Sequence, residues 1–188
     1  MAVGNLVYEL SISLDGRIET KDGTLDFVEP DEEFHGIVNE SSAASGGFVY
    51  GRRSWEIMDY WFTAEENPEA HEHEKEFGRI FNRTPKFVCS RTLTQGELKG
   101  DTKLISDDVP GAIRKLKEED EGDLGVCGAE LATSLLREGL IDELRLWIHP
   151  VWLGQGKELF VDYERLDLKL MDEQRIGTGA VLCHYAIS

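Results

Sequence analysis

Positive charge is scarce in this sequence. Its 188 residues include 20 lysines and arginines against 37 aspartates and glutamates, which gives a formal net charge of −17 at pH 7. A surface this acidic repels nucleic-acid phosphates and anionic lipid headgroups, so we expect neither a nucleic-acid partner nor a membrane partner. A small molecule that carries phosphate must then be attracted by local cations, and the positions of the few arginines become informative.

Cysteines and long hydrophobic runs are also few. Cys89, Cys127 and Cys183 lie far apart in apolar stretches without a C-x-x-C pair, which favours buried thiols in a reducing compartment over disulfide or metal chemistry. No apolar run approaches the roughly 20 residues that span a bilayer. Residues 1–9 lack the basic start of a signal peptide and reach Glu9 early, so we expect a cytoplasmic protein.

Several familiar catalytic motifs are missing as well. The sequence has no G-x-S-x-G elbow of a serine hydrolase and no H-x-E with P-C-x-x-C of a zinc deaminase. Residues 71–74, His-Glu-His-Glu, lack a third ligand at a useful spacing, so we expect a solvated helix start and no metal site. Residues 154–157, Gly-Gln-Gly-Lys, contain only half of a P-loop and are interpreted as a turn.

Hydrophobic periodicity alternates between strands and helices along the chain. Period-2 or fully apolar runs predict strands at residues 6–13, 48–50, 86–90, 102–105, 125–127, 144–149, 166–175 and 180–187. Helical spacing predicts helices at residues 31–44, 54–60, 109–119 and 129–138, and another that ends near residue 83. This order predicts one domain over residues 1–188, with a three-layer α/β/α fold, a mixed and mostly parallel central sheet, and a C-terminal antiparallel hairpin.

The most informative turn lies at residues 51–55, Gly-Arg-Arg-Ser-Trp, between an apolar strand and a helical pattern. Gly51 permits a ligand to approach the backbone, and Ser54 is predicted to cap the helix, whose first N–H groups favour an anion. Arg52 and Arg53 add fork-shaped donors that suit phosphate. The segment predicts a phosphate site, with a solvated arginine pair after a turn as the alternative.

Two further strand ends carry chemistry that is compatible with phosphate. The strand at 125–127 passes through small residues directly into a helix, a geometry that cradles a pyrophosphate on backbone N–H groups; close helix–strand packing is the alternative. The strand at 86–89 is followed by a cation and two hydroxyls, Ser90, Arg91 and Thr92. Because ligands of open α/β sheets bind at the carboxyl ends of strands, one dinucleotide can contact all three segments.

In their order and spacing, these segments resemble the dihydrofolate reductase-like superfamily, in particular the reductase domain of riboflavin biosynthesis and its stand-alone relatives. Residues 13–18, Ser-Leu-Asp-Gly-Arg-Ile, look like the family's S-L-D-G-x-I. Residues 51–55 are similar to its G-R-x-T-W/Y turn, with Ser54 in place of threonine. The match continues at residues 60–61, 85–93, 139–144 and 150–160 and so covers nearly the whole chain.

The resemblance implies NADPH as the cofactor. It places the adenosine phosphates at Gly51, Arg52, Arg53, Ser54, Ser90, Arg91 and Thr92, with the three arginines as candidates for the 2′-phosphate. It places the pyrophosphate at Cys127, Gly128, Ala129, Glu130 and Leu131, and the nicotinamide between Ser11 and Ile18. Cys127 departs from the family's usual Gly-Gly pair, whose peptide bond is often cis in these enzymes.

The resemblance also implies a reductase that transfers a hydride to a pterin- or pyrimidine-like heterocycle and forms a homodimer through strands around residues 144–153. Phe27, Met58 and Trp61 are candidates for the wall of the substrate cavity. Glu32 and Asp15 are candidate catalytic acids, with helix-dipole complementation and turn chemistry as the respective alternatives. Asp31 and Glu33 compete with Glu32 for the position of the helix carboxylate.

Two other functions stay open at this point. One is the riboflavin-pathway 5-amino-6-(5-phosphoribosylamino)uracil reductase, and the other is a module that binds NADP without catalysis. Residues 24–27, Thr-Leu-Asp-Phe, stand where the riboflavin branch usually has Ser-x-Trp. That difference favours the stand-alone reductases.

Overall fold

The structure, a computed structural model, describes residues 4–119, 122–160, 163 and 165–188. Within these residues, an eight-stranded sheet has the order β5-β4-β3-β6-β1-β7-β10-β9. Neighbours from β5 to β7 are parallel, whereas β10 is antiparallel to both β7 and β9. The strands are β1 (Leu6–Ser13), β3 (Gly47–Gly51), β4 (Lys86–Cys89), β5 (Thr102–Ile105), β6 (Leu124–Cys127), β7 (Glu143–His149), β9 (Leu168–Arg175) and β10 (Val181–Ile187).

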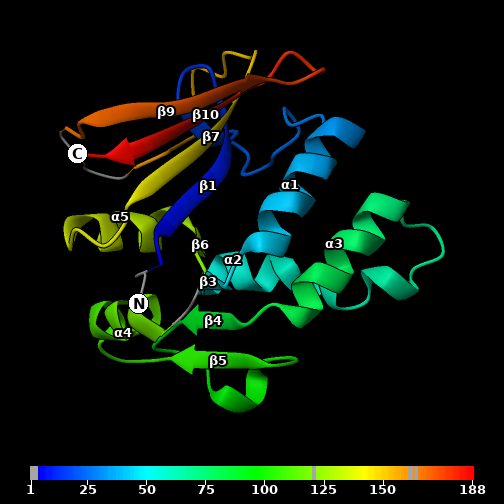
Figure 1. Ribbon diagram of the computed structural model, residues 1–188. Coiled ribbons are helices and arrows are strands. Elements are labelled where there is room, and N and C mark those ends of the chain that lie inside the picture. Colours follow the sequence, from blue (N-terminus) through cyan, green and yellow to red (C-terminus); the bar gives the residue numbers. More distant parts are fainter. Residues whose placement is uncertain (1–3, 120–121, 161–162, 164) are drawn as a thin grey trace.

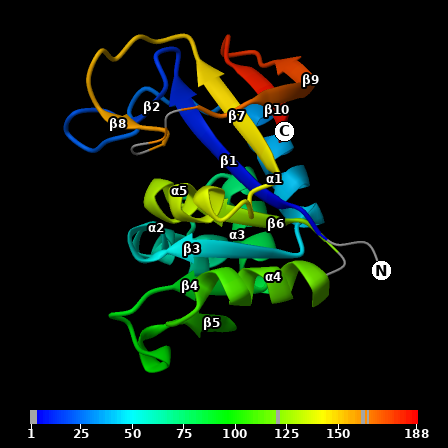
Figure 2. The same ribbon diagram turned by 90° about the vertical axis from the view of Figure 1, so that its left-hand side faces the viewer.

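Helices cover both faces of the sheet (Figures 1 and 2). They are α1 (Glu32–Ala44), α2 (Arg52–Ile57), α3 (Glu72–Arg83), α4 (Val109–Glu119) and α5 (Ala129–Arg137). Because β6 lies between β3 and β1, α1 crosses the sheet in one direction and α5 crosses it in the other. Right-handed crossovers in opposite directions place these two helices on opposite faces. The predicted three-layer fold with a mixed, mostly parallel sheet is therefore confirmed.

The central strands are apolar on both sides because both of their faces are covered. On β3, Phe48 and Tyr50 pack against Phe81 of α3, while Val49 points to the opposite face and joins the core under α4 and α5. Successive side chains thus alternate between two cores. The continuous apolar run of this strand follows from its position in the middle of the sheet.

The C-terminal hairpin formed by β9 and β10 is confirmed, and it extends the main sheet through the pairing of β10 with β7. A second, two-stranded sheet, β2 (Arg17–Glu19) with β8 (Lys157–Glu158), was not predicted. No described helix reaches the length and hydrophobicity that a membrane crossing requires.

The helix that follows β3 begins earlier than predicted. Gly51 is its N-cap, with an extended backbone and no side-chain hydrogen bond, and Arg52 is its first residue. Ser54 therefore lies inside the first turn, and the prediction that it caps the helix is wrong.

The histidine-rich segment is a helix start, as predicted. His71 is the N-cap of α3, and it forms a capping box with Glu74. No group of metal-binding side chains occurs among the described residues.

Candidate functional site

Three parallel strands end side by side at one edge of the sheet. Gly51 of β3 pairs with Cys89 of β4, and Tyr50 of β3 pairs with Cys127 of β6. The segments that follow these strands enclose a cavity of about 730 Å³, which we call the strand-end cavity. Its wall includes the following predicted residues: Gly51, Arg52, Arg53, Ser54, Ser90, Arg91, Thr92, Gly128, Ala129, Glu130 and Leu131. The sheet thus brings together three segments that the sequence had singled out separately.

Arg52 links two of these segments. Its Nε donates to Glu56 Oε1 at 2.8 Å, and one terminal nitrogen donates to Thr92 Oγ1 at 2.8 Å. The hydrogen bond and the charge of Glu56 raise the pKa of Arg52, which stays charged. The guanidinium is half exposed and oriented across the gap between the β3 turn and the loop after β4, so its position is well defined while its charge remains accessible to a ligand.

Three other cations lie on the same wall. Arg53 and Lys157 each lie 4.0 Å from the carboxylate of Glu130, in the first turn of α5. Within the described part of the chain, no side chain pairs with Arg91, which is exposed. Sequence reasoning missed Lys157, because it assigned residues 154–157 to a turn. That turn exists, since Gly154 and Gly156 have positive φ, and it delivers Lys157 to the cavity.

Gly128 lets the turns after β3 and β6 pack closely. Its φ is +113°, and a Cβ placed there would lie 2.8 Å from Ser54 Oγ. A side chain at this position is therefore disfavoured by both its backbone conformation and its surroundings. Gly128 is the N-cap of α5 and provides no side-chain cap, and the first turn of this helix lines the cavity. The peptide between Cys127 and Gly128 is trans.

A second cavity, of about 330 Å³, lies between α1 and the sheet, and we call it the α1-side cavity. Its wall is mostly apolar and aromatic, with Phe34, Val38, Phe48, Tyr50, Met58, Phe77 and Trp147 among its residues. Ser11 and Cys127 also line it. Consecutive residues thus divide the two cavities, because Tyr50 and Cys127 face the α1 side while Gly51 and Gly128 face the strand-end cavity.

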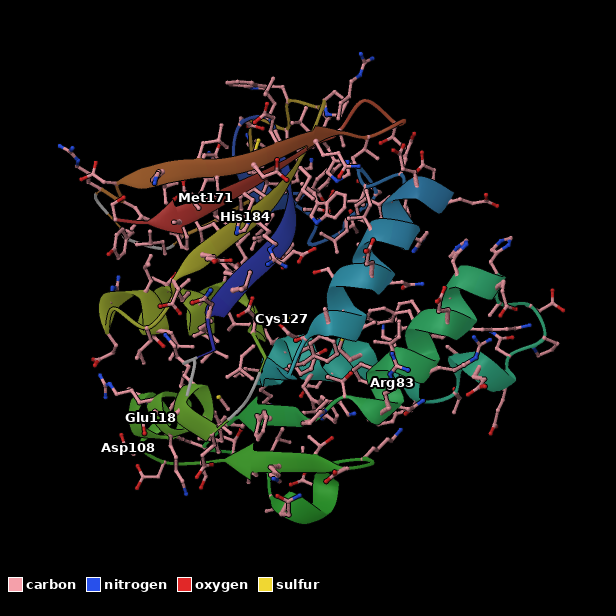
Figure 3. All side chains as sticks on the ribbon, in the orientation of Figure 1. Arg83, Asp108, Glu118, Cys127, Met171 and His184 are labelled. Carbon is pink, nitrogen blue, oxygen red and sulfur yellow. The ribbon has the colours of Figure 1, made fainter. Side chains whose placement is uncertain are left out.

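Cys127 lies near the middle of the molecule, at the end of β6 (Figure 3). Burial, and to a smaller extent the charge of Glu9, raise the pKa of its thiol to about 12. The side chain is therefore a neutral thiol at physiological pH and is not a nucleophile. Cys127 was predicted as part of the pyrophosphate segment, but it lines the α1-side cavity, whereas Gly128 to Leu131 line the strand-end cavity.

Glu9 of β1 is a polar group of the α1-side cavity that sequence reasoning missed. Its Oε1 accepts the indole N–H of Trp147 at 3.0 Å, and its Oε2 accepts the hydroxyl of Ser41 at 3.1 Å. Arg145 lies 3.8 Å from the same carboxylate and also donates to Ser41. A carboxylate in the middle of a largely buried strand was the available sequence signal.

The two predicted catalytic acids lie outside both cavities. Asp15 accepts the backbone N–H groups of Leu153 and Gly154 and the hydroxyl of Ser13, and these bonds, that of Leu153 first, lower its pKa to about 2. Asp15 is ionised at neutral pH, and its carboxylate holds the turn at residues 153–154 through these backbone hydrogen bonds. Glu32 is an exposed residue of the first turn of α1, and neither cavity includes it. Both placements agree with the alternatives, turn chemistry and helix-dipole complementation.

Three further predicted residues also lie away from the cavity walls. Ile18 is buried in the core on the α5 side, Phe27 packs edge-on against His149, and Trp61 packs against Phe77. Met58 is the one predicted substrate residue on the α1-side wall. The three were chosen by their position in the motifs, which does not specify the direction of a side chain.

A serine–histidine pair adjoins the α1-side cavity. Ser11 Oγ lies 3.1 Å from Nε2 of His149, which is buried. Burial lowers the pKa of His149 below its ordinary value of 6.5, so the ring is neutral at pH 7. Because Ser11 lines the cavity, this pair connects a titratable group to the cavity through one hydroxyl.

Comparison with known proteins gives the same picture of the fold. Over 184 residues the chain is 34% identical to the uncharacterized protein YyaP of Bacillus subtilis (strain 168). The match covers 96% of this chain and 93% of that protein. A putative riboflavin biosynthesis protein from Shewanella sp. PV-4 superposes with a TM-score of 0.74 at 22% identity, covering 98% of this chain and 99% of that chain.

A longer protein contains a similar domain. The Thermotoga maritima diaminohydroxyphosphoribosylaminopyrimidine deaminase/5-amino-6-(5-phosphoribosylamino)uracil reductase superposes with a TM-score of 0.69 at 12% identity, and the match covers 98% of this chain and 57% of that one. Residues 5–182 match the RibD C-terminal domain. The chain therefore belongs to the RibD C-terminal domain family, a reductase family of dihydrofolate reductase-like fold.

Proposed function

We propose that this protein is an NADPH-dependent reductase that transfers a hydride to a pterin- or pyrimidine-like heterocycle. The observation that carries the proposal is the division at the ends of β3 and β6, where a cation-bearing cavity and a mostly apolar cavity adjoin at consecutive residues. Such an arrangement suits a ligand with phosphates at one end and a reacting ring at the other. NADPH, when bound, supplies the hydride.

The residues of the strand-end cavity fit the phosphates of this cofactor. Arg52, Arg53, Arg91 and Lys157 provide the charge, with Arg52 or Arg91 as the partner of the 2′-phosphate. Gly51 and Gly128 leave the backbone accessible, and the first turn of α5 offers N–H groups to a pyrophosphate. At about 730 Å³, the cavity lies within the usual range of roughly 300–1,000 Å³ for ligand sites.

Ser11 is the proposed route of the proton that must follow the hydride. It lines the α1-side cavity and is hydrogen-bonded to His149, whereas Asp15 and Glu32 line neither cavity. Ser11→Ala should therefore lower the turnover rate without changing the dissociation constant of NADPH. A comparable loss of turnover rate and of NADPH affinity would indicate that Ser11 acts by binding the cofactor.

The proposal is tested by titrating the protein with NADPH while following tryptophan fluorescence and binding heat. We expect saturable quenching and tighter binding of NADPH than of NADH. The absence of both signals would reject the cofactor assignment. Consumption of NADPH with a heterocyclic substrate then separates a reductase from a module that only binds NADP.

A second candidate is the riboflavin-pathway reductase, which the family membership and the similarity to the Thermotoga maritima protein favour. Its substrate, 5-amino-6-(5-phosphoribosylamino)uracil, carries a phosphate. Turnover of this compound at a rate above that of unphosphorylated pterins would favour this candidate over the leading one.

We also propose a homodimer that uses the strands around residues 144–153. Trp152, which follows β7, is 72% exposed, and the edge strand β9 exposes Leu170 and Met171 (Figure 3). Burying such side chains is favourable at about 25 cal/mol per Å². Light scattering should give twice the 21.2 kDa mass of the chain, and Trp152→Glu should give the monomer.

A further inference from the structure

The charge of the α1-side cavity differs from that of the strand-end cavity. Its charged lining residues are Glu9, Asp123 and Arg145. Arg145 is already surrounded by carboxylates, at 3.8 Å from Glu9, 3.9 Å from Asp123 and 3.7 Å from Glu143. A phosphate group in this cavity would meet a guanidinium whose charge is already compensated, together with carboxylates that repel it.

The carboxylate of Glu9 is oriented and still has acceptor capacity. Each of its oxygens accepts one protein hydrogen bond, from Trp147 at 3.0 Å and from Ser41 at 3.1 Å. A carboxylate offers about four acceptor positions, so each oxygen can accept one more bond. Two acceptors held side by side match two adjacent N–H donors, as on the amidine edge of an aminopyrimidine or a pterin.

The remaining wall suits a flat ring. Phe34, Tyr50, Met58 and Phe77 present apolar or aromatic surface to the same cavity. Its volume of about 330 Å³ lies at the small end of ligand sites, which fits a one- or two-ring heterocycle without a large substituent.

We propose that the α1-side cavity binds a planar heterocycle without a phosphate, which presents two adjacent N–H donors to Glu9. Glu9 recognises the ring, and Ser41, Trp147 and Arg145 are the positioning residues that hold its carboxylate. The inference rests on the proposed function in one respect, because it identifies the heterocycle as the hydride acceptor. The binding itself does not require NADPH, so it can be measured on the protein alone.

The test compares 6-hydroxymethylpterin with its phosphate monoester, which differ only in the phosphate. Quenching of pterin fluorescence gives both dissociation constants on the wild-type protein. We expect the phosphate ester to bind at least about 10-fold more weakly, because it brings a phosphate into a cavity whose single cation already faces three carboxylates. Equal or tighter binding of the ester, or no binding of either compound, would overturn the inference.

The variant Glu9→Gln tests the recognising residue. Gln replaces one acceptor with a donor at almost unchanged size, and we expect pterin binding to weaken about 10- to 100-fold. Glu40→Gln, on an exposed position of α1 that lines neither cavity, is the matched control and should bind like the wild type. Unchanged binding by Glu9→Gln would reject Glu9 as the recognising residue. The comparison of the two pterins on the wild-type protein needs no variant and holds even if this one is unstable.

The assignment of NADPH as the cofactor and the inference about Glu9 can be rejected independently of each other. A protein that binds NADPH but not the pterin would overturn the inference about Glu9 and leave the cofactor assignment standing. A protein that binds the pterin but not NADPH would leave this inference standing and reject the proposed function.

Discussion

The strand-end cavity carries four cations and three carboxylates on its wall, whereas the α1-side cavity carries a single cation that three carboxylates already surround. The two cavities adjoin at consecutive residues of β3 and β6, so a ligand that extends from one into the other meets opposite chemistry at its two ends. This difference supports the proposal that phosphates bind in the strand-end cavity and that a neutral ring binds in the α1-side cavity. Changes confined to one cavity should therefore leave ligands of the other unaffected.

The largest effect is expected at Gly128, which holds the turns after β3 and β6 together. Gly128→Ala forces an L-residue to φ +113° beside Ser54. We expect a loss of about 1–3 kcal/mol in the free energy of unfolding, measured by urea denaturation, and loss of detectable NADPH binding. The control is Gly36→Ala in α1, where a Cβ meets nothing within 4 Å and about 0.5–1 kcal/mol should be gained. Equal behaviour of the two variants would contradict the role given to Gly128.

The next effect concerns charge in the strand-end cavity. Arg52→Ala removes the guanidinium that Glu56 and Thr92 orient, and we expect NADPH to bind about 10- to 100-fold more weakly with little change for NADH or for pterin. Arg83→Ala, at the exposed end of α3, is the charge-matched control (Figure 3). Similar losses of affinity for NADPH and NADH in calorimetric titrations would contradict the assignment of the 2′-phosphate to Arg52.

A smaller effect should depend on pH. Because the pKa of Asp15 is about 2 in the folded protein and 3.8 ordinarily, its contribution to stability is complete above about pH 4 and is lost as the pH falls toward 2. Asp15→Asn should lower the melting temperature at pH 7, and the difference from the wild type should vanish near pH 2. The same variant should also weaken NADPH binding modestly, since Asp15 holds the turn that positions Lys157 on the cavity wall. A difference that persists unchanged at pH 2 would contradict the assignment.

The smallest effect is expected at Glu130, whose carboxylate lies between Arg53 and Lys157. Glu130→Gln frees the exposed Arg53 and the half-buried Lys157 and should strengthen NADPH binding about 2- to 5-fold, in the opposite direction to Arg52→Ala. Weaker binding in the same titration would show that Glu130 supports the cofactor and does not compete with it.

The two cavities also differ in how far the sequence predicted them. The strand-end cavity consists of short continuous segments that directly follow strands, and the strand ends are adjacent because of the sheet register. Gly51, Ser90 and Gly128 could therefore be grouped in advance. Lys157 was missed because its approach depends on β8, a two-residue strand without a hydrophobic pattern.

The α1-side cavity could not be predicted in the same way. Its polar centre joins Glu9 to Trp147, which are 138 positions apart, and it is completed by a side chain of α1. No local pattern relates these residues, because their meeting depends on the order of β1 and β7 and on the crossover of α1. Asp15 and Glu32 were chosen by their place in motifs, but backbone hydrogen bonds direct Asp15 toward residues 153–154, and Glu32 occupies an exposed position in the first turn of α1.

A crystal structure of the protein with NADPH and 6-hydroxymethylpterin most directly tests whether phosphates and ring bind in different cavities. We expect the phosphates of the dinucleotide within hydrogen-bond distance of Arg52, Arg91 or the first turn of α5, and the pterin edge on Glu9. A dinucleotide whose phosphates lie in the α1-side cavity, or a pterin bound away from Glu9, would contradict the account.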